Sequence, residues 1–257
     1  MSLENAELTK ISINTFVTTK IAFANMLADL CERIPGGDVD VVSDALGLDL
    51  RIGRKYLTGA LGYGGPCFPR DNVALSYLAR TLGTRAELAE TTDRVNRSVA
   101  ASVIERLQLP VVRGATMAVL GLAYKPSSHV IEESQGMSLV KALANTGARV
   151  IAHDPLAARP AAQELRDHAV VLDSVADCLA QADVVVIANP DPVYRSLQPS
   201  DFKNGRASVT VVDCWRLLAD KLQNVPHIRY ISLGRSVDDR ASSERLRQLW
   251  AIPGDGS

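Results

Sequence analysis

The sequence lacks the features that mark membrane proteins and nucleic-acid-binding proteins. None of its apolar runs approaches the roughly 18 residues that a membrane-spanning helix requires. Positive and negative side chains nearly balance, with a formal net charge of −1 over 257 residues, so nothing favours nucleic acid or an anionic membrane surface. The start, Met1-Ser2-Leu3 followed by Glu4, is not that of a signal peptide. We therefore expect a globular, cytoplasmic protein.

Cysteine is scarce and widely spaced. The four cysteines form no CxxC pair and show no metal-ligand spacing, and the four histidines are scattered as well. This pattern predicts neither a disulfide framework nor a metal site, and it fits reduced thiols. The cysteines are Cys31, Cys67, Cys178 and Cys214.

Residues 1–108 predict a domain made of helices alone. Apolar residues recur almost all round from Glu4 to Ile34, which is typical of a buried helix, and Pro35-Gly36-Gly37 ends it. Three more helices are expected, at 38–46, 72–82 and 84–107.

Residues 109–257 predict a second, α/β domain. Strands that are unbroken apolar runs alternate with helices, which indicates a parallel sheet covered on both faces. Ligands of such sheets bind in the loops at the carboxyl ends of the strands. Four loops are indicated in this way: Gly121–Lys125, Asp154-Pro155, Asn189-Pro190-Asp191 and Asp213–Arg216. The expected strands lie at 116–125 (with a glycine turn), 149–155, 183–188, 209–213 and 230–234, the helices at 134–145, 175–180 and from Arg240 to Trp250. The turn Gly121-Leu122-Ala123 lacks the G-x-G-x-x-G spacing, so nothing marks an NAD site.

The stretch from Gly62 to Asp71 concentrates three glycines, two prolines, a thiol, a cation and a carboxylate in ten residues. Pro69 suits the first turn of a helix, so Cys67 would lie just ahead of a helix N-terminus, with Arg70 three residues on. Both features favour the thiolate, which is the nucleophilic form. The alternative is a turn that carries an inert, buried cysteine.

Two polar features precede this stretch. Lys10 and Asn14 share one face of the first helix, where a buried lysine would need a partner; the alternative is a lysine that extends into solvent from a frayed end. Arg51, Arg54 and Lys55 would suit a phosphate-bearing ligand or could be an ordinary charged turn.

Taken together, these residues resemble the UDP-glucose/GDP-mannose dehydrogenase family, which oxidises nucleotide sugars to uronic acids. The thiol motif of 62–71, Glu7–Lys20 and Gly121–Pro126 carry the resemblance, which covers nearly the whole chain. It implies a helical central dimerisation domain followed by a Rossmann-like domain that binds the nucleotide sugar. The family's N-terminal NAD-binding domain has no counterpart here, so NAD would be bound mainly by a domain absent from this sequence.

The resemblance also implies a chemistry centred on Cys67. Hydride transfer from the C6 alcohol would give an aldehyde, which Cys67 would take up as a thiohemiacetal; a second transfer would give a thioester, which water hydrolyses. Lys10 and Asn14 match the pair that stabilises the developing oxyanion. Asp71 matches the carboxylate that orders the lysine and the water.

Five further positions match ligand contacts of the family. Tyr56 and the backbone around Gly64 match the sugar-diphosphate cradle, and Lys125 a contact to the nucleotide half. Arg51 matches an arginine that reaches the substrate of the neighbouring subunit, which implies a homodimer through the long helix. Arg70 stands where the family usually has a lysine near the cofactor.

Two positions depart from the family pattern. Glu132 and Trp215 stand where the family usually has arginine, and Arg216 could substitute for the second.

The Cys67-Phe68-Pro69 form favours UDP-glucose over an N-acetylhexosamine. We therefore expect part of a UDP-glucose 6-dehydrogenase, inactive alone. The alternatives are the same chemistry on GDP-mannose or a UDP-N-acetylhexosamine, and a non-catalytic module for nucleotide-sugar binding and dimerisation.

Overall fold

Contacts within the chain divide it into two compact units. The computed structural model describes residues 1–107, 114–202, 205, 207–236, 243–244 and 246–248. One unit comprises residues 1–19 and 61–232, and the other residues 20–60 and 233–257. The expected domain boundary at 108–109 falls on residues 108–113, outside the described residues, and stays a prediction.

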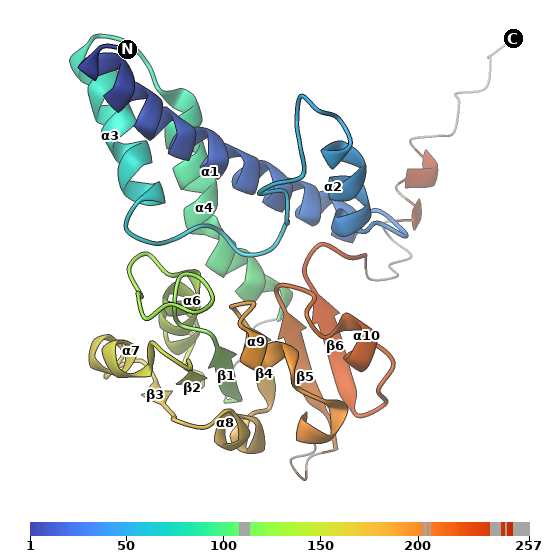
Figure 1. The fold of residues 1–257 in the computed structure, drawn as a ribbon. Helices are drawn as coiled ribbons and strands as arrows, with labels where there is room; N and C mark the ends of the chain where they lie inside the picture. The colour runs from blue at the N-terminus through green and yellow to red at the C-terminus, as the bar shows by residue number, and fades with distance from the viewer. Residues whose placement is uncertain (108–113, 203–204, 206, 237–242, 245, 249–257) are drawn as a thin grey trace, which may run out of the picture. The chain divides into compact units, whose positions relative to one another are not determined.

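Four helices form where the first 108 residues predicted them (Figure 1). They are α1 (Leu3–Arg33), α2 (Val39–Gly47), α3 (Phe68–Thr81) and α4 (Glu87–Arg106). α3 begins four residues before the expected range 72–82, with Cys67 just ahead of it and Pro69 in its first turn, as Pro69 itself predicted. α4 begins three residues later than expected, because the backbone of Ala86 is not helical.

The expectation that α1 is buried is wrong for the single chain. Large apolar side chains along the helix are substantially exposed, including Phe16 at 68% and Phe23 at 43%. The apolar residues that recur around the helix are therefore not all covered by the rest of the described chain. In the described part of the chain, no helix is both long enough and apolar enough to cross a bilayer.

The larger unit contains a parallel sheet of six strands in the order β3-β2-β1-β4-β5-β6. All five neighbouring pairs are parallel, as the apolar runs predicted. This order places the topological switch point between β1 and β4, where ligands of such sheets bind. The strands are β1 (Thr116–Leu120), β2 (Arg149–His153), β3 (Val170–Val171), β4 (Val184–Ile187), β5 (Val209–Asp213) and β6 (Ile228–Ser232).

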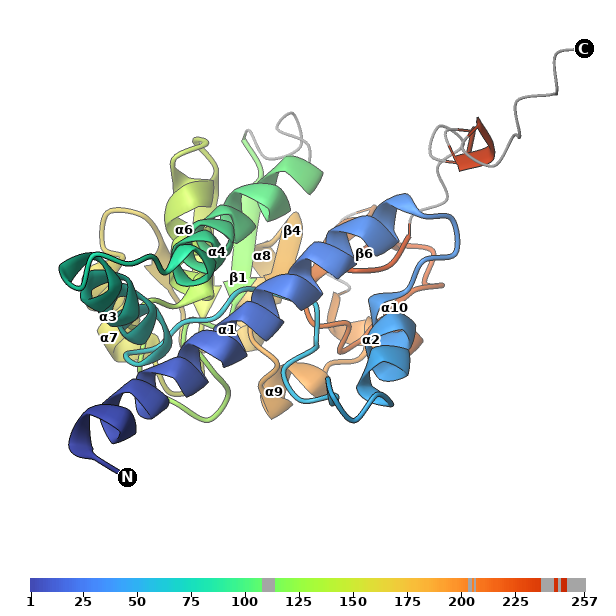
Figure 2. The same ribbon diagram turned by 90° about the horizontal axis from the view of Figure 1, so that it is seen from above.

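Helices pack against the sheet (Figure 2). Apolar side chains of the helices and of the strands form the core between them. Side chains alternate across a strand, so Ala118 and Leu120 face a cluster that includes Cys178, Phe202 and Val211. Met117 and Val119, which point the other way, are equally buried. The helices are α6 (Gln135–Ala144), α7 (Ala158–Glu164), α8 (Val175–Gln181), α9 (Pro192–Arg195), α10 (Ala219–Leu222) and the 3-10 helix η1 (Pro199–Phe202). Sequence analysis did not predict β3, α7, α9 or α10, all of which are short.

The smaller unit combines the second half of α1 with α2 and a short segment after β6. The Val39 N–H donates to the Gly234 C=O at 2.8 Å, and the Gly234 N–H donates to Glu32 Oε1 at 2.6 Å. Lys20 Nζ donates to the carbonyls of Ile52 and Gly53, which fixes the loop after α2. The helix expected from Arg240 to Trp250 lies largely outside the described residues.

Candidate functional site

Asp71 brings Lys10 and Asn14 together. Its Oδ2 accepts from Lys10 Nζ at 2.5 Å and from Asn14 Nδ2 at 2.6 Å. The partner expected for Lys10 is therefore Asp71, although 56% of the lysine side chain is exposed, so the lysine is not on a buried face. Only 4% of the Asp71 side chain is exposed. A nearly buried carboxylate thus organises two donors of the first helix.

These contacts keep Asp71 ionised. Burial acts to raise the pKa of the Asp71 carboxyl, but the hydrogen bonds from Lys10 and Asn14 and the nearby positive charges outweigh it and hold the pKa below its ordinary value. Arg70 contributes to the positive charge, with its Nε 3.6 Å from Asp71 Oδ1. At neutral pH the Asp71 carboxyl is therefore ionised.

Cys67 lies at the start of the same helix. It is the residue that precedes α3, and its side chain makes no capping hydrogen bond and is exposed. The Asp71 N–H donates to the Cys67 C=O at 2.9 Å, which closes the first turn. The thiol and the Asp71 cluster therefore lie one helical turn apart along α3.

Glycine is required in the loop before Cys67, because other groups approach its backbone closely. A Cβ on Gly64 would lie 2.2 Å from the Glu133 C=O oxygen, and one on Gly65 would lie 2.5 Å from the Tyr124 ring. The Gly65 N–H donates to the Glu132 C=O at 2.9 Å. Glu132, where the sequence departs from the family pattern, and Glu133 thus lie against the loop through their backbone.

A small cavity of about 70 Å³ lies at the switch point of the sheet. Lys125 lines it from the loop after β1, Asn189 from the loop after β4 and Trp215 from the loop after β5. Gly62 and Gln135 are also among its lining residues. Three of the four loops that the sequence indicated as ligand loops therefore meet here. Among the described residues, the buried Asn189 Oδ1 has no hydrogen-bond partner, so it is available to a donor on a ligand.

The fourth loop has another role. Asp154, after β2, accepts from the N–H groups of Leu122 and Ala123 at 2.8 and 2.9 Å. Its other oxygen accepts from Leu156 and Ala157 at 2.9 and 2.7 Å. The glycine turn after β1 is where a Rossmann fold presents N–H groups to a pyrophosphate. Here a buried carboxylate of the chain itself takes them.

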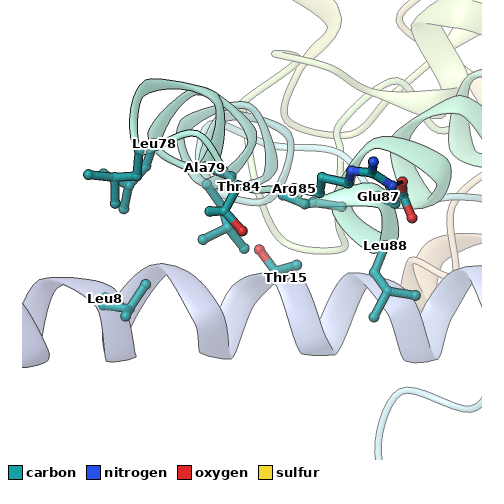
Figure 3. A pocket seen from close by; sticks show the side chains of 12 residues that line it. Leu8, Thr15, Leu78, Ala79, Thr84, Arg85, Glu87 and Leu88 are labelled. Carbon is teal, nitrogen blue, oxygen red and sulfur yellow. Dashed lines mark hydrogen bonds and ion pairs between the residues drawn. The ribbon is translucent and has the colours of Figure 1, made fainter.

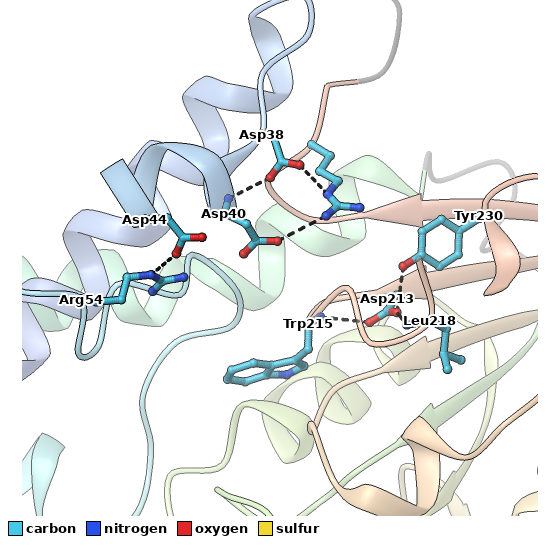
Figure 4. A network of polar contacts seen from close by, with 9 residues as sticks. Asp38, Asp40, Asp44, Arg54, Asp213, Trp215, Leu218 and Tyr230 are labelled. Carbon is cyan, nitrogen blue, oxygen red and sulfur yellow. Dashed lines mark hydrogen bonds and ion pairs between the residues drawn. The ribbon is translucent and has the colours of Figure 1, made fainter. Parts of the chain in front are cut away.

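Asp213 fixes the loop that carries Trp215 (Figure 4). Its carboxylate accepts from the Trp215 N–H at 3.1 Å, the Leu218 N–H at 2.8 Å and the Tyr230 hydroxyl at 2.9 Å. Trp215 Nε1 donates to the Ala188 C=O at 3.0 Å. The indole N–H is therefore used within the protein, and the side chain offers a ligand only its apolar ring.

Two expected site residues, Tyr56 and Arg51, belong to the smaller unit. Tyr56 adopts φ 69°, and 48% of it is exposed. Arg51 pairs with Asp49 at 2.6 Å and is almost fully exposed. Figure 4 shows other ion pairs of this unit, such as Arg54 with Asp44. The roles expected for Tyr56 and Arg51 stay predictions.

A second, larger cavity of about 550 Å³ lies between α1, α3 and the turn before α4 (Figure 3). Leu8, Leu78 and Leu88 are among its mainly apolar lining residues. The Thr15 hydroxyl has no hydrogen-bond partner within the part of the chain that the structure describes. None of the site residues expected from the sequence lines it. It is therefore separate from the candidate site.

Sequence analysis missed a buried polar network beside the glycine loop. It joins Tyr63 to Asn72, Asp93 and Asn96, and its hydrogen bonds link α3, α4 and the loop. Asp93 and Asn96 are three residues apart, so they lie on one face of α4. Two polar residues at this spacing in an otherwise apolar helix face could have indicated the network from the sequence.

These features define a Rossmann-like α/β protein whose helical region carries an exposed thiol close in sequence to a buried carboxylate. Two family models identify it further. The central domain of the UDP-glucose/GDP-mannose dehydrogenase family matches residues 4–98, and the UDP binding domain of that family matches residues 118–220. The chain belongs to this family.

Individual relatives agree. The chain is 33% identical over 237 residues to UDP-glucose 6-dehydrogenase TuaD of Bacillus subtilis, covering 91% of this chain and 51% of that protein. It is 36% identical to UDP-glucose 6-dehydrogenase of Rhizobium meliloti, covering 90% and 53%. A UDP-glucose dehydrogenase structure from Pyrobaculum islandicum superposes with a TM-score of 0.81 at 32% identity, covering 92% and 52%. The chain thus spans about half the length of these relatives.

Proposed function

We propose that this chain is the substrate-binding and thiol-bearing part of a nucleotide-sugar 6-dehydrogenase, with UDP-glucose as the substrate. The observation that carries the proposal is the convergence of Lys10 and Asn14 on Asp71, one helical turn from the exposed Cys67. Family membership supports the same chemistry, because its members include UDP-glucose 6-dehydrogenases.

The nucleotide half of the substrate would bind at the switch point of the sheet. Lys125 supplies a positive charge there, and Asn189 supplies an unpaired acceptor. The sugar would lie towards the Gly64 backbone and the thiol, with Tyr56 on the sugar-diphosphate portion. The present cavity is too small for a nucleotide, so binding would require its loops to open.

Cys67 would act on a C6 aldehyde. The thiolate adds to the carbonyl carbon, a C–S bond forms, and the carbonyl π pair moves to the oxygen, which becomes an oxyanion. The Lys10 ammonium and the Asn14 amide retain N–H groups beyond those that Asp71 accepts. These donors would stabilise the oxyanion. Asp71 would hold both donors in place and order the water that later hydrolyses a thioester.

The glycine turn after β1 does not fit the phosphates of NAD. The N–H groups of the glycine turn already donate to Asp154, so they are not available to a dinucleotide phosphate. We therefore derive no hydride step within the chain, and Arg70 is the one residue proposed to face a cofactor bound elsewhere. The proposed consequence is a chain that binds nucleotide sugar and does not oxidise it alone.

A homodimer through α1 is part of the proposal. Phe16, Phe23 and Leu30 are exposed at seven-residue intervals, which places them along one side of the helix. A second α1 would cover this stripe, and Arg51 of that partner would then approach the substrate. Sedimentation equilibrium should give a dimer, and Phe16→Glu should weaken it; a monomer at all concentrations would refute this part.

A thermal-shift panel tests the substrate proposal. UDP-glucose at about 100 times its Kd should stabilise the chain by roughly 2.7 kcal/mol, and GDP-mannose and a UDP-N-acetylhexosamine should stabilise it less. Incubation with UDP-glucose and NAD should give no NADH. The absence of stabilisation by every nucleotide sugar would refute the proposal, and NADH formation would refute the inactivity of the chain alone.

The second candidate is a non-catalytic module for nucleotide-sugar binding and dimerisation. The occupied glycine turn at Asp154 is compatible with such a module, which needs no dinucleotide, and equally with the enzyme, whose NAD would be bound elsewhere. Supplying the NAD-binding domain of a relative as a separate polypeptide distinguishes the two. NADH formation that Cys67→Ser abolishes would support the enzyme, and continued inactivity would support the module.

A further inference from the structure

Asn96, on α4, holds the glycine loop by its backbone. Asn96 Oδ1 accepts from the Tyr63 N–H at 2.8 Å, and Asn96 Nδ2 donates to the Tyr63 C=O at 2.9 Å. One amide thus pairs with both peptide groups of a loop residue, as a neighbouring strand would. A Cβ on Gly62 would lie 2.0 Å from Asn96 Oδ1, so the amide lies directly against the loop.

The side chain of Tyr63 is held by the same helix, one turn earlier. Its hydroxyl donates to Asp93 Oδ1, and Asn72 Nδ2 donates to both of these oxygens at 3.0 Å. Tyr63, Asp93 and Asn72 are all buried. Asn72 directly follows Asp71 in α3. The network therefore links the glycine loop to the helix that carries the Asp71 cluster.

We propose that Asn96 is a positioning residue that sets the glycine loop for the sugar of the substrate. The inference rests on the proposed function, in which the sugar lies along the Gly64 backbone. A loop with three glycines has wide conformational freedom, so its geometry must come from such external contacts. The nucleotide cavity, in contrast, is lined mainly by loops of the sheet, and the loop that Asn96 holds contributes only Leu61 and Gly62 to it. Loss of Asn96 should therefore affect the sugar half of the ligand and spare the nucleotide half.

Titration calorimetry with UDP and with UDP-glucose separates the two halves. In the whole chain, Asn96→Ala should weaken UDP-glucose about tenfold, which corresponds to about 1.4 kcal/mol, and should change UDP affinity by less than about twofold. Asn96→Asp keeps the acceptor for the Tyr63 N–H but loses the donor to the C=O, so it should shift the affinities in the same direction. Ser98→Ala, an exposed position on the same helix, is the matched control and should change neither.

Several outcomes would overturn the inference. They are equal losses for UDP and UDP-glucose, which a merely structural role would give, and unchanged UDP-glucose affinity in the variants. If Asn96→Ala fails to fold, Asn96→Asp alone decides by the same criteria. No binding of either ligand to the unaltered chain would refute the proposed function itself, and with it this inference.

Discussion

The pair of Lys10 and Asp71 can be compared directly with a surface pair of the same geometry. Lys10 Nζ lies 2.5 Å from Asp71 Oδ2, and Lys141 Nζ lies 2.5 Å from Glu164 Oε1. The carboxylates differ in burial: 4% of the Asp71 side chain is exposed, against 48% for Glu164. Any difference in interaction energy should therefore come from burial and not from distance.

The expected difference is about 1 kcal/mol. An exposed pair such as Lys141–Glu164 should contribute about 0.2–1 kcal/mol, since water screens the charges and the side chains lose entropy. Asp71 is nearly buried, but Lys10 is more than half exposed, so this pair should fall well short of the about 3–5 kcal/mol lost on breaking a fully buried one. We expect a coupling energy of about 1–2 kcal/mol for Lys10–Asp71.

Urea unfolding of two double-mutant cycles measures both energies. The variants are Lys10→Met with Asp71→Asn, and Lys141→Met with Glu164→Gln. The pKa of Asp71 is lower in the folded state, so its contribution is present above the ordinary value of 3.8 and is lost as pH falls through the lowered folded-state pKa. When the first cycle is repeated towards pH 3, the coupling energy between Lys10 and Asp71 should therefore decrease. A Lys10–Asp71 coupling no larger than that of Lys141–Glu164 at pH 7 would refute the argument from burial.

Two more predictions concern the glycine loop and the thiols. Gly65→Ala should lower the free energy of unfolding by at least about 2 kcal/mol more than Gly83→Ala does. Both positions have positive φ, but only at Gly65 would the added Cβ collide with another side chain, that of Tyr124. Equal urea midpoints for the two variants would contradict this. In the native protein, iodoacetamide should label Cys67 and leave Cys178 unmodified, because Cys178 is buried and burial raises the pKa of its thiol to about 12. Mass spectrometry of the digested protein checks this, and native labelling of Cys178 would contradict it.

Periodicity was sufficient to predict the long elements of the fold. α1, α2 and the five longer strands follow directly from apolar spacing and from glycine and proline stops. Short elements such as β3, with two residues, and α10, with four, carry too few residues for a period to be visible. The exposure of α1 could not be predicted, because a single-chain pattern does not indicate which chain covers an apolar face.

The candidate site was predicted through resemblance more than through spacing. Spacing placed Lys10 and Asn14 on one face, but their shared partner Asp71 lies 61 and 57 residues away, and only the folded chain brings the three together. The amide of Asn96 was missed because its partners are peptide groups, which every residue possesses. A side chain that recognises backbone leaves no complementary residue in the sequence.

The carboxylate of Asp154 acts as a built-in surrogate for a phosphate. It neutralises the peptide dipoles that other sheets of this order offer to a dinucleotide, and with its second oxygen it ties down the chain after β2. The ligand selectivity of the turn and the stability of the fold therefore depend on the same carboxylate. A substitution of Asp154 that freed the N–H groups of Leu122 and Ala123 for an external anion would also remove the hydrogen bonds that hold the chain after β2. Substitutions in the loops after the neighbouring strands can therefore change the ligand, whereas a single substitution of Asp154 would change ligand binding and stability together.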